Sequence, residues 1–298
     1  MKKNYSVDII IPTYRPNADF EKLLRMIGIQ SVKPGKIIII NTDKYEWKKC
    51  GCESMISAAS GVMCEVHHIA MDEFHHGYSR NFGAGFSDTE YFICMTQDAI
   101  PADEFMIEKL MGEMGDKVRM AYARQIPKGD ARDIEKITRR FNYPEEPVIK
   151  GSKDIDDLGI KTFFASNVCC AYDHRTFTEL GGFADKTDFN EDMIYASKLV
   201  KAGYFISYCP DAKVMHSHNY TPLQQFKRNY QLAVSQAEHP EVFGGIRSES
   251  EGIKLVKETA GILRSEGKLY LIPELVFTSG MKYLGYRAGK IPSGRKHK

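Results

Sequence analysis

Acidic and histidine side chains stand at three points of this 298-residue sequence where the pattern predicts a turn. Asp98 follows a short apolar run, Glu191 and Asp192 precede a helical pattern, and His216 and His218 follow another apolar run. Asp98 could hold a cation or approach a phosphate. Two histidines at i and i+2 in extended chain point the same way, so both could face one cation. One carboxylate of the adjacent pair could act as a general base.

Each of these residues also has a purely structural interpretation. Asp98 could begin the helix expected from Pro101, because caps are more common than ligands. Two carboxylates at a helix start often only complement the helix dipole, with Asn190 as the cap. A single histidine is more often structural than functional. The joint arrangement, and no single residue, therefore favours a chemical role.

Two further segments carry groups suited to binding a phosphate. The first apolar run ends in Pro12-Thr13-Tyr14-Arg15, and ligands of open parallel sheets bind beyond the carboxyl ends of strands. Arg80 lies ahead of Gly83-Ala84-Gly85, small residues that would let a helix lie close to a sheet. Its guanidinium could face a phosphate. The structural alternative for 12–15 is a turn that only ends a strand, and the alternative for the Arg80 segment is a solvated surface turn. No G-x-G-x-x-G follows the first strand, which argues against an NAD or FAD enzyme.

The elements that must position these groups alternate between strand and helix patterns. Apolar, β-branched runs predict strands, and helical periodicity lies between them, as expected for a doubly wound α/β fold. The predicted strands are 7–11, 36–40, 63–69, 91–95, 119–126, 204–208 and 212–216. The predicted helices open at Pro16-Asn17, near Tyr78, at Pro101, near Arg175 and near Glu191. Residues 127–160 are highly charged and predict a long loop over a site, and the chain beyond Tyr220 is mainly helical.

Composition excludes several other classes. Lys and Arg number 41 against 39 Asp and Glu, an excess too small for a dedicated nucleic-acid binder. Seven cysteines without a C-x-x-C pair predict free thiols in a reducing cytosol. The apolar start is interrupted by Asp8 and Pro12, and no run is long enough to span a bilayer. We expect a soluble protein or one that only touches a membrane, and the sequence leaves a homo-oligomer open.

Five motifs in register resemble glycosyltransferase family 2, and their spacing resembles its rhamnosyltransferase branch. They are P-T-Y-R at 12–15, F-H-H-G through R-N at 74–81, T-Q-D-A-I-P-A-D at 96–103, N-E-D at 190–192 and H-S-H-N-Y at 216–220. The resemblance covers roughly residues 5–220. It implies a GT-A fold and an inverting, metal-dependent enzyme of surface polysaccharide synthesis. Its donor would be dTDP-L-rhamnose, and its acceptor a glycan or lipid-linked hydroxyl.

The same resemblance implies roles for individual residues. Asp98 matches the metal-binding carboxylate, and His216, with His218 beside it, would complete a site for Mn²⁺ or Mg²⁺. Asp192 matches the base of an E-D pair with Glu191. The residues implied to bind the nucleotide-sugar are Pro12, Thr13, Tyr14, Arg15, Thr42, Asp43, His76, Gly77, Arg80, Asn81, Gln97 and Asp98.

This sequence departs from the family pattern at two points. The usual acid after the second strand is replaced by Asn41-Thr42, with Asp43 one step later, and Gln97 removes one carboxylate of the D-x-D element. Two alternatives therefore stay open. One is a transferase of the same fold that uses UDP-glucose, UDP-galactofuranose or a UDP-N-acetylhexosamine. The other is a non-catalytic carbohydrate-binding protein.

We expect a catalytic domain over 1–220 and a helical extension with a basic tail over 221–298. Within the domain, about 1–125 would bind the nucleotide-sugar and 126–220 would face the acceptor. In the extension, apolar residues at 269–277 precede a run of cationic ones, which suits peripheral contact with an anionic membrane. The alternative is that these residues pack on the catalytic domain or on a second subunit, with Pro273 breaking the helix.

Overall fold

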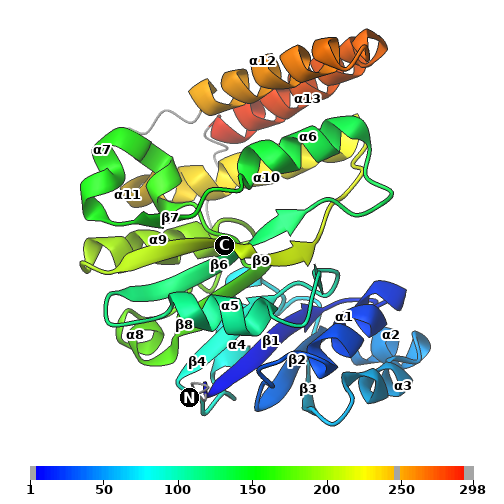
Figure 1. Ribbon diagram of the computed structural model, residues 1–298, viewed down its shortest axis with the longest axis vertical. Coiled ribbons are helices and arrows are strands. Elements are labelled where there is room, and N and C mark those ends of the chain that lie inside the picture. The colour runs from blue at the N-terminus through cyan, green and yellow to red at the C-terminus, as the bar shows by residue number, and fades with distance from the viewer. Residues whose placement is uncertain (1–4, 245–248, 292–298) are drawn as a thin grey trace.

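The computed structural model describes residues 5–244 and 249–291 as an α/β fold around one nine-stranded sheet (Figure 1). The strand order is β3-β2-β1-β4-β8-β6-β9-β5, and β7 pairs with β9. β5, β7 and β8 run opposite to the other strands, which share one direction. The strands are β1 Val7–Thr13, β2 Lys36–Thr42, β3 Met63–Ile69, β4 Tyr91–Met95, β5 Ile100–Pro101, β6 Val118–Ile126, β7 Val148–Lys150, β8 Cys169–Asp173 and β9 Phe205–Met215.

The first half of the chain forms four neighbouring parallel strands, as the apolar runs predict. Ile9 pairs with Ile37 and Ile11 with Ile39, and all four side chains are fully buried. Such strands are covered on both faces, which explains their unbroken apolar sequence. On one face, a Cβ added to Gly83 would lie 2.4 Å from Ile10 Cγ2, so only glycine lets that helix approach β1 this closely.

The helices up to α9 lie mostly where the sequence predicts them, although α2, α3 and η1 were not predicted. Outside residues 127–163, these helices are α1 Ala18–Gly28, α2 Lys44–Lys49, α3 Cys52–Ile56, η1 Ser57–Ala59, α4 His76–Ala84, α5 Met106–Glu113, α8 His174–Glu179 and α9 Glu191–Lys201. One expected start is wrong. Pro101 does not begin a helix but pairs with Val214 as part of β5. Asp103 then accepts a hydrogen bond from the Phe105 amide at 2.9 Å, and α5 begins at Met106.

The charged segment 127–160 is structured, so the expectation of a long loop is wrong. It contains α6 Asp133–Asn142, β7, η2 Ser152–Asp154 and α7 Ile155–Leu158, and η3 Gly159–Phe163 follows. Two contacts order it: Ile137 is buried in a small apolar cluster, and Ile149 of β7 pairs with Ser207 of β9. The Lys150 ammonium is buried and donates to the Lys161 carbonyl oxygen at 3.1 Å. These partners are distant in sequence, so local periodicity does not reveal them.

The two last predicted strands form a single strand, β9. Its pairing with β6 shifts between Cys209, opposite Ala123, and Lys213, opposite Arg124. A bulge therefore produces the interruption that reads as two strands. The chain beyond it is helical, as expected, with α10 Pro222–Glu238, α11 Pro240–Phe243, α12 Glu249–Ser265, η4 Leu269–Leu271 and α13 Ile272–Lys290.

Pro273 does not break the last helix; it lies in the first turn of α13, where proline is tolerated. α13 packs closely on α10 through glycines: Cβ atoms added to Gly285 and Gly289 would each lie 2.3 Å from a carbonyl oxygen of α10. The basic tail from Arg295 lies outside the described residues. Within 5–244 and 249–291, no helix combines the length and apolarity needed to cross a bilayer. All seven cysteines lie in this part and carry free thiols.

Candidate active site

The candidate site residues collect at one edge of the sheet because β1, β4, β6 and β9 share a direction. The turns that follow these strands carry Tyr14, Asp98, Lys128 and His216 respectively. β8 runs the opposite way, so Asn167, two residues before its first residue, reaches the same edge. Five separate segments therefore converge where ligands of open α/β sheets bind.

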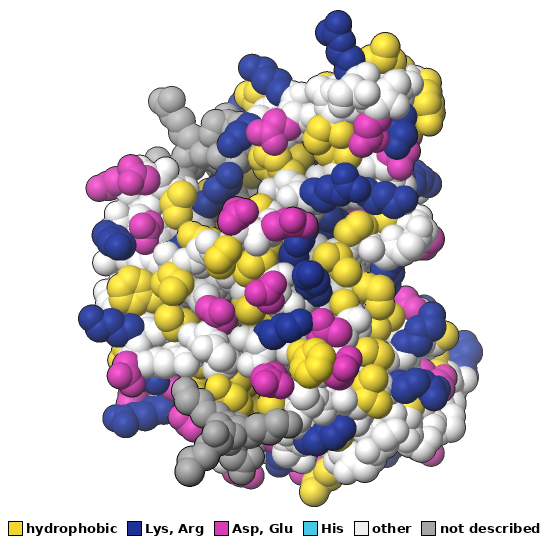
Figure 2. All heavy atoms as spheres, viewed as in Figure 1, with side chains coloured by type: hydrophobic (Ala, Val, Ile, Leu, Met, Phe, Trp, Pro, Cys, Tyr) yellow, Lys and Arg dark blue, Asp and Glu magenta, His cyan; other side chains and the backbone are white. Residues whose placement is uncertain are grey.

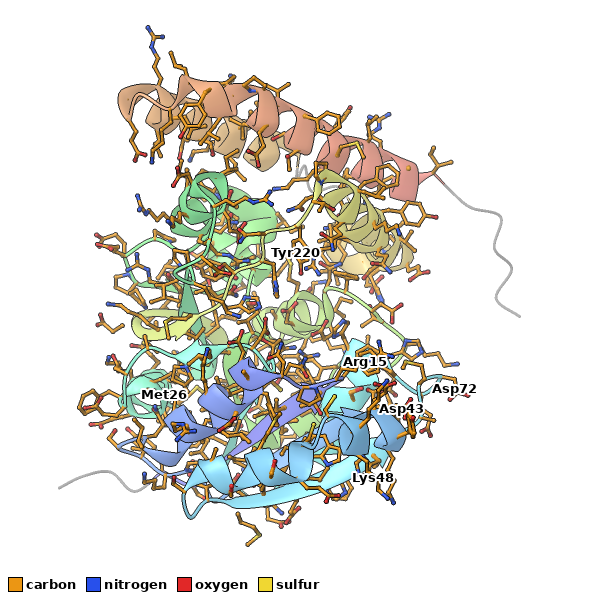
Figure 3. The ribbon with its side chains drawn as sticks, turned by 90° about the vertical axis from the view of Figure 1, so that its right-hand side faces the viewer. Arg15, Met26, Asp43, Lys48, Asp72 and Tyr220 are labelled. Atoms are coloured by element: carbon orange, nitrogen blue, oxygen red, sulfur yellow. The ribbon has the colours of Figure 1, made fainter. Side chains whose placement is uncertain are left out.

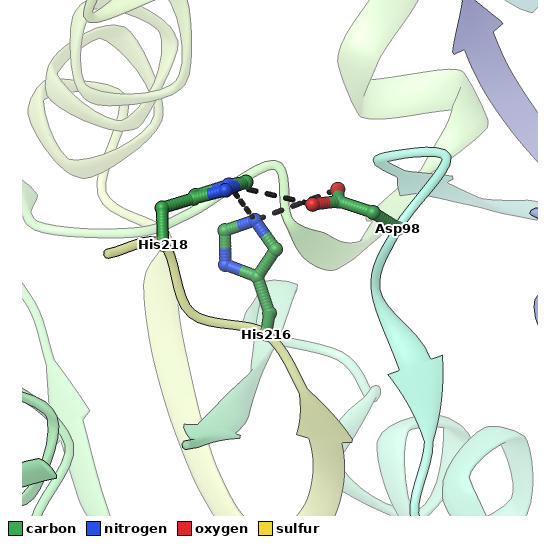
Figure 4. Close-up of side chains that lie close together, drawn as sticks. All are labelled: Asp98, His216 and His218. Atoms are coloured by element: carbon green, nitrogen blue, oxygen red, sulfur yellow. Dashed lines mark hydrogen bonds and ion pairs between the residues drawn. The ribbon is translucent and has the colours of Figure 1, made fainter. Parts of the chain in front are cut away.

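Asp98 and the two histidines form one compact cluster (Figure 4). Asp98 Oδ1 lies 3.5 Å from His216 Nε2, and Oδ2 lies 3.3 Å from His218 Nε2. The two Nε2 atoms are 3.1 Å apart. All three potential ligand atoms lie within 4.8 Å of one another. Asp98 is not a helix cap, and the expectation that both histidines face one point agrees with this geometry.

The chemistry of this donor set fits a divalent cation. His216 Nδ1 lies 3.0 Å from Gln125 Oε1, which also accepts from Arg139. Because that oxygen can only accept, His216 carries its proton on Nδ1 and leaves the Nε2 lone pair toward Asp98. Burial holds the pKa of His216 well below its usual value, with help from nearby cations. Burial also lowers the pKa of His218 although Asp98 opposes it, so both imidazoles are neutral at pH 7.

Gln97 joins the turn that follows β4 to the turn that follows β1. Its Oε1 accepts from the Tyr14 amide at 2.9 Å, and its Nε2 donates to the Tyr14 carbonyl oxygen at 3.0 Å. A carboxylate could accept the first bond but not donate the second. The loss of one acid from the D-x-D pattern thus has a structural reason. Next to this clamp, Thr13 Oγ1 donates to Asn41 Oδ1 at 3.3 Å, linking the ends of β1 and β2.

Arg15 and Asp43 lie near each other on the side shown in Figure 3, with Tyr220 above them. Arg15 donates to both carboxylate oxygens of Glu46, at 2.9 and 3.1 Å. Asp43 caps α2 by accepting from the Tyr45 amide at 2.9 Å. Arg15 and Asp43 have φ angles of 46° and 69°, a left-handed conformation that costs energy in residues other than glycine. Such strain is common at ligand-binding turns.

Thr42 is buried at the end of β2, and Pro12 is partly buried within β1. Both therefore lie beside the Tyr14 turn.

Glu191 and Asp192 have different surroundings at the start of α9. Glu191 Oε1 lies 3.3 Å from a guanidinium nitrogen of Arg80 and accepts from Asn167 Nδ2 at 2.9 Å. Asp192 Oδ2 accepts from the Asn167 amide at 3.1 Å. Burial alone would raise the pKa of Glu191, but Arg80 and His76 outweigh it, and the pKa is lowered. Burial and the neighbouring Glu191 charge raise the pKa of Asp192 to about 7.

The H-G-x-x-R-N element binds the segment that leads into α9. Arg80 is buried, donates to the His76 carbonyl oxygen at 3.0 Å and pairs with Glu191, so its charge is directed at that carboxylate instead of an open phosphate site. Asn81 donates to the Phe183 carbonyl oxygen at 2.9 Å. A Cβ added to Gly77 would lie 1.8 Å from the carbonyl oxygen of Ala184, so glycine is required there.

The helix start itself also differs from expectation. Asn190 occupies the cap position but its side chain makes no capping bond. The side-chain Nδ2 of Asn190 instead donates to Ser235 Oγ of α10 at 3.2 Å. The φ angle of Asn190 is 64°. α10 therefore helps to fix the chain just before the two carboxylates.

Two cationic residues near the Asp98 cluster were not predicted from the sequence. Lys128 Nζ lies 3.8 Å from Asp98 Oδ2 and 2.9 Å from Asp19 Oδ2. Arg228 of α10 lies over the rings of Tyr220 and Phe189, at 4.7 and 5.4 Å from their centroids. In the described part of the chain, no carboxylate forms an ion pair with Arg228. Lys128 could have been found from its place just after β6; no local motif marks Arg228, Gln125 or Asn167.

Sequence comparisons show the family to which the chain belongs. The model of glycosyl transferase family 2 matches residues 8–181. The chain is 35% identical over 95% of its length to the O-antigen chain rhamnosyltransferase RfbN of Salmonella typhimurium, covering 89% of that protein. It is also 35% identical over 96% of its length to the O-antigen chain rhamnosyltransferase WbaN of Salmonella anatum, again covering 89%. The chain therefore belongs to glycosyl transferase family 2.

Solved structures show the same fold at low sequence identity. A mannosyltransferase of Pyrobaculum calidifontis, in complex with GDP-Man and Mn²⁺, has a TM-score of 0.67 at 11% identity. That match covers 98% of this chain and 89% of the other. TarS of S. aureus, residues 1–349 with UDP-GlcNAc, has a TM-score of 0.53 at 12% identity, covering 96% and 90%. The protein is thus a glycosyltransferase with the GT-A fold, as its motifs predict.

Proposed function

We propose that this enzyme transfers L-rhamnose from dTDP-L-rhamnose to an acceptor hydroxyl during the synthesis of a surface polysaccharide, with inversion at the anomeric carbon and with the help of Mn²⁺ or Mg²⁺. The observation that carries this proposal is the 35% identity, over 95% and 96% of the chain, to two O-antigen chain rhamnosyltransferases. The site supports this proposal in two ways. Asp98 has two histidine neighbours that could bind a cation with it, and the pKa of Asp192 is raised.

Asp98, His216 and His218 would hold the cation, which stabilises the negative charge on a departing diphosphate when bound. Lys128 and Arg228 place two more positive charges at this edge of the site, where they can bind phosphate oxygens. The Pro12–Arg15 turn, with Thr42 and Asp43, would hold the nucleotide beside them. We assign these contacts as part of the same proposal.

Asp192 is proposed as the general base. A base works best when its pKa is near the working pH, and Asp192 is raised to about 7. It would take the proton from the acceptor hydroxyl as that oxygen attacks the anomeric carbon opposite the leaving diphosphate. One displacement inverts the configuration and needs no covalent nucleophile. Glu191, held by Arg80 and Asn167, is proposed to position Asp192 and to raise its pKa, with His76, Gly77 and Asn81 supporting the same segment.

A short path of contacts joins the Asp98–His216–His218 cluster to the Glu191–Asp192 pair. His216 contacts Gln125, and Gln125 Nε2 donates to Ser166 Oγ at 2.9 Å. The next residue, Asn167, binds both Glu191 and Asp192. This path supports a single active centre. We place its acceptor, a glycan or a lipid-linked sugar, on the side built by residues 126–220 of a catalytic domain over 1–220, and the reaction in the cytoplasm.

Titration with dTDP and UDP, each with and without Mn²⁺, tests the donor and the metal together. We expect dTDP to bind more tightly than UDP, and both to bind more tightly with Mn²⁺. Transfer from dTDP-L-rhamnose should then give a product whose anomeric configuration, read by NMR, is opposite to that of the donor. Preference for UDP would favour the UDP-sugar alternative, and a product of retained configuration would contradict the assignment of Asp192.

A further inference from the structure

The outward face of α13 is apolar and unpartnered within the described residues. Its inner positions, such as Leu275 and Gly285, are buried against the rest of the protein. On the opposite face, Val276, Phe277, Tyr283 and Leu284 are each between 53% and 63% exposed. An ordinary surface helix places polar residues on its solvent side. α13 differs, because apolar residues lie on its solvent-facing side as well as on its buried side.

The apolar face continues beyond α13 in both directions. Tyr270 and Ile291 are 73% and 68% exposed, and they stand seven residues before Phe277 and seven after Leu284. Phe277 and Leu284 are two helical turns apart and lie along one line of α13, and Tyr270 of η4 and Ile291 add exposed apolar side chains at its two ends. At 1.5 Å per residue, the 19 residues of α13 are about 28 Å long. In Figure 2, hydrophobic side chains gather at the upper right, over the end of α12 and the start of α13.

This part of the chain carries an unusual charge. Residues 249–298 contain ten Lys and Arg and five Glu, so they hold a formal charge of +5 in a chain whose total is +2. The single acid of α13, Glu274, lies 3.6 Å from Arg132 of α6. Arg287 lies over the Tyr283 ring at 5.9 Å, where its charge borders the apolar face.

The position of the face suits contact with a membrane. α12 and α13 form one end of the molecule, and β2 and β3 lie toward the other end (Figures 1 and 3). A surface resting on α13 would therefore leave the nucleotide-binding half toward the solution. It would bring the proposed acceptor side closer to the lipid.

We propose that the outward face of α13, with Tyr270 and Ile291 at its ends, binds the surface of an anionic lipid bilayer. The apolar side chains would enter the boundary between headgroups and acyl chains, and the surrounding cations would contact the anionic headgroups. A second copy of this chain fits less well, because two faces bordered by cations such as Arg287 would repel each other across the contact. The helix lies on the bilayer and does not cross it. Membrane contact of α13 rests on the proposed function, since a lipid-linked acceptor would lie at the bilayer surface.

The test is co-sedimentation of the full chain with vesicles of phosphatidylcholine alone or mixed with phosphatidylglycerol. We expect binding to the mixed vesicles that weakens as salt rises, and little binding to phosphatidylcholine alone. Replacing Phe277 and Leu284 together by Ser should weaken binding roughly tenfold or more, since two apolar side chains no longer enter the lipid. The control replaces Met63 and Ile149 by Ser; these are 60% and 54% exposed on β3 and β7, and binding should be unchanged.

Equal binding of both double variants, or no binding of the parent at low salt, would overturn the proposal. So would a parent that is dimeric by analytical ultracentrifugation while the Phe277/Leu284 variant is monomeric. All four substituted residues are exposed, so the unfolding midpoints should match. Transfer to a water-soluble acceptor should be the same in all variants. Failure of vesicle binding with transfer intact would therefore leave the proposed reaction standing.

Discussion

The two carboxylate centres of this enzyme differ in the charge of their neighbours. Asp98 is surrounded by His216, His218 and Lys128, which are neutral or positive. Asp192 stands next to the negative Glu191. The first environment offers neighbours that can share a bound cation with Asp98, whereas the second makes a negative charge on Asp192 costly. The same functional group can thus serve as a ligand in one place and as a proton acceptor in the other.

Removing the ligand carboxylate should have the largest effect. Asp98→Ala should lower kcat by roughly 10³-fold or more, because the stabilisation of the departing diphosphate is lost. Steady-state transfer with saturating Mn²⁺ measures it, and Asp88→Ala, at an exposed acid, is the control. His216→Ala should be more damaging than His218→Ala, since only His216 is buried and oriented by Gln125. An Asp98→Ala enzyme with most of its activity would remove the distinction between the two centres.

Removing the base should have a smaller but still large effect. Asp192→Asn should lower kcat by roughly 10²-fold or more, the scale of losing a positioned general base. The isosteric amide keeps the volume, so the KM for the donor should change little. If Asp192→Asn stays active while Glu191→Gln is inactive, the two roles are reversed.

The pH dependence of kcat distinguishes the pair more finely. Asp192 must be ionised to accept a proton, so activity should fall as the pH drops below about 7. Glu191→Gln removes the neighbouring negative charge and frees Arg80, and both changes favour ionised Asp192. The acidic limb should then move to lower pH, even if the maximal rate falls. A limb that stays in place would show that Glu191 does not set the pKa of Asp192.

The cation beside Asp98 should have the smallest effect of this series. Lys128→Met should raise the KM for the donor roughly tenfold, the scale of one hydrogen bond to a charged group. Lys22→Met is a matched control, because Lys22 also pairs with Asp19 but does not contact Asp98. Equal effects of the two substitutions would mean that Lys128 acts through Asp19 alone.

Local patterns predicted the elements that carry the site, and they failed where distant contacts decide the structure. The β1 and β4 runs are buried on both faces, so their apolar sequence was sufficient. Asp98 and His216 were found because they follow strands that share an edge. The 127–160 segment was missed because its order depends on pairing of β7 with β9.

The same limit applies within the site. The sequence placed Arg80 near phosphate because its charge suits one, whereas the fold buries it against Glu191. Asn167, which binds both carboxylates, carries no local signal at all. Contacts between residues far apart in sequence therefore determine which charge serves which role.

In the proposed reaction, Asp98 holds the cation that stabilises the leaving group, and Asp192 accepts the proton of the acceptor hydroxyl. Calorimetric titration of the parent, Asp98→Ala and Asp192→Asn with dTDP, with and without Mn²⁺, tests this division of roles most directly. We predict that Mn²⁺ strengthens dTDP binding by the parent and by Asp192→Asn, and that this gain is absent in Asp98→Ala. A gain that persists in Asp98→Ala, or disappears in Asp192→Asn, would contradict the account.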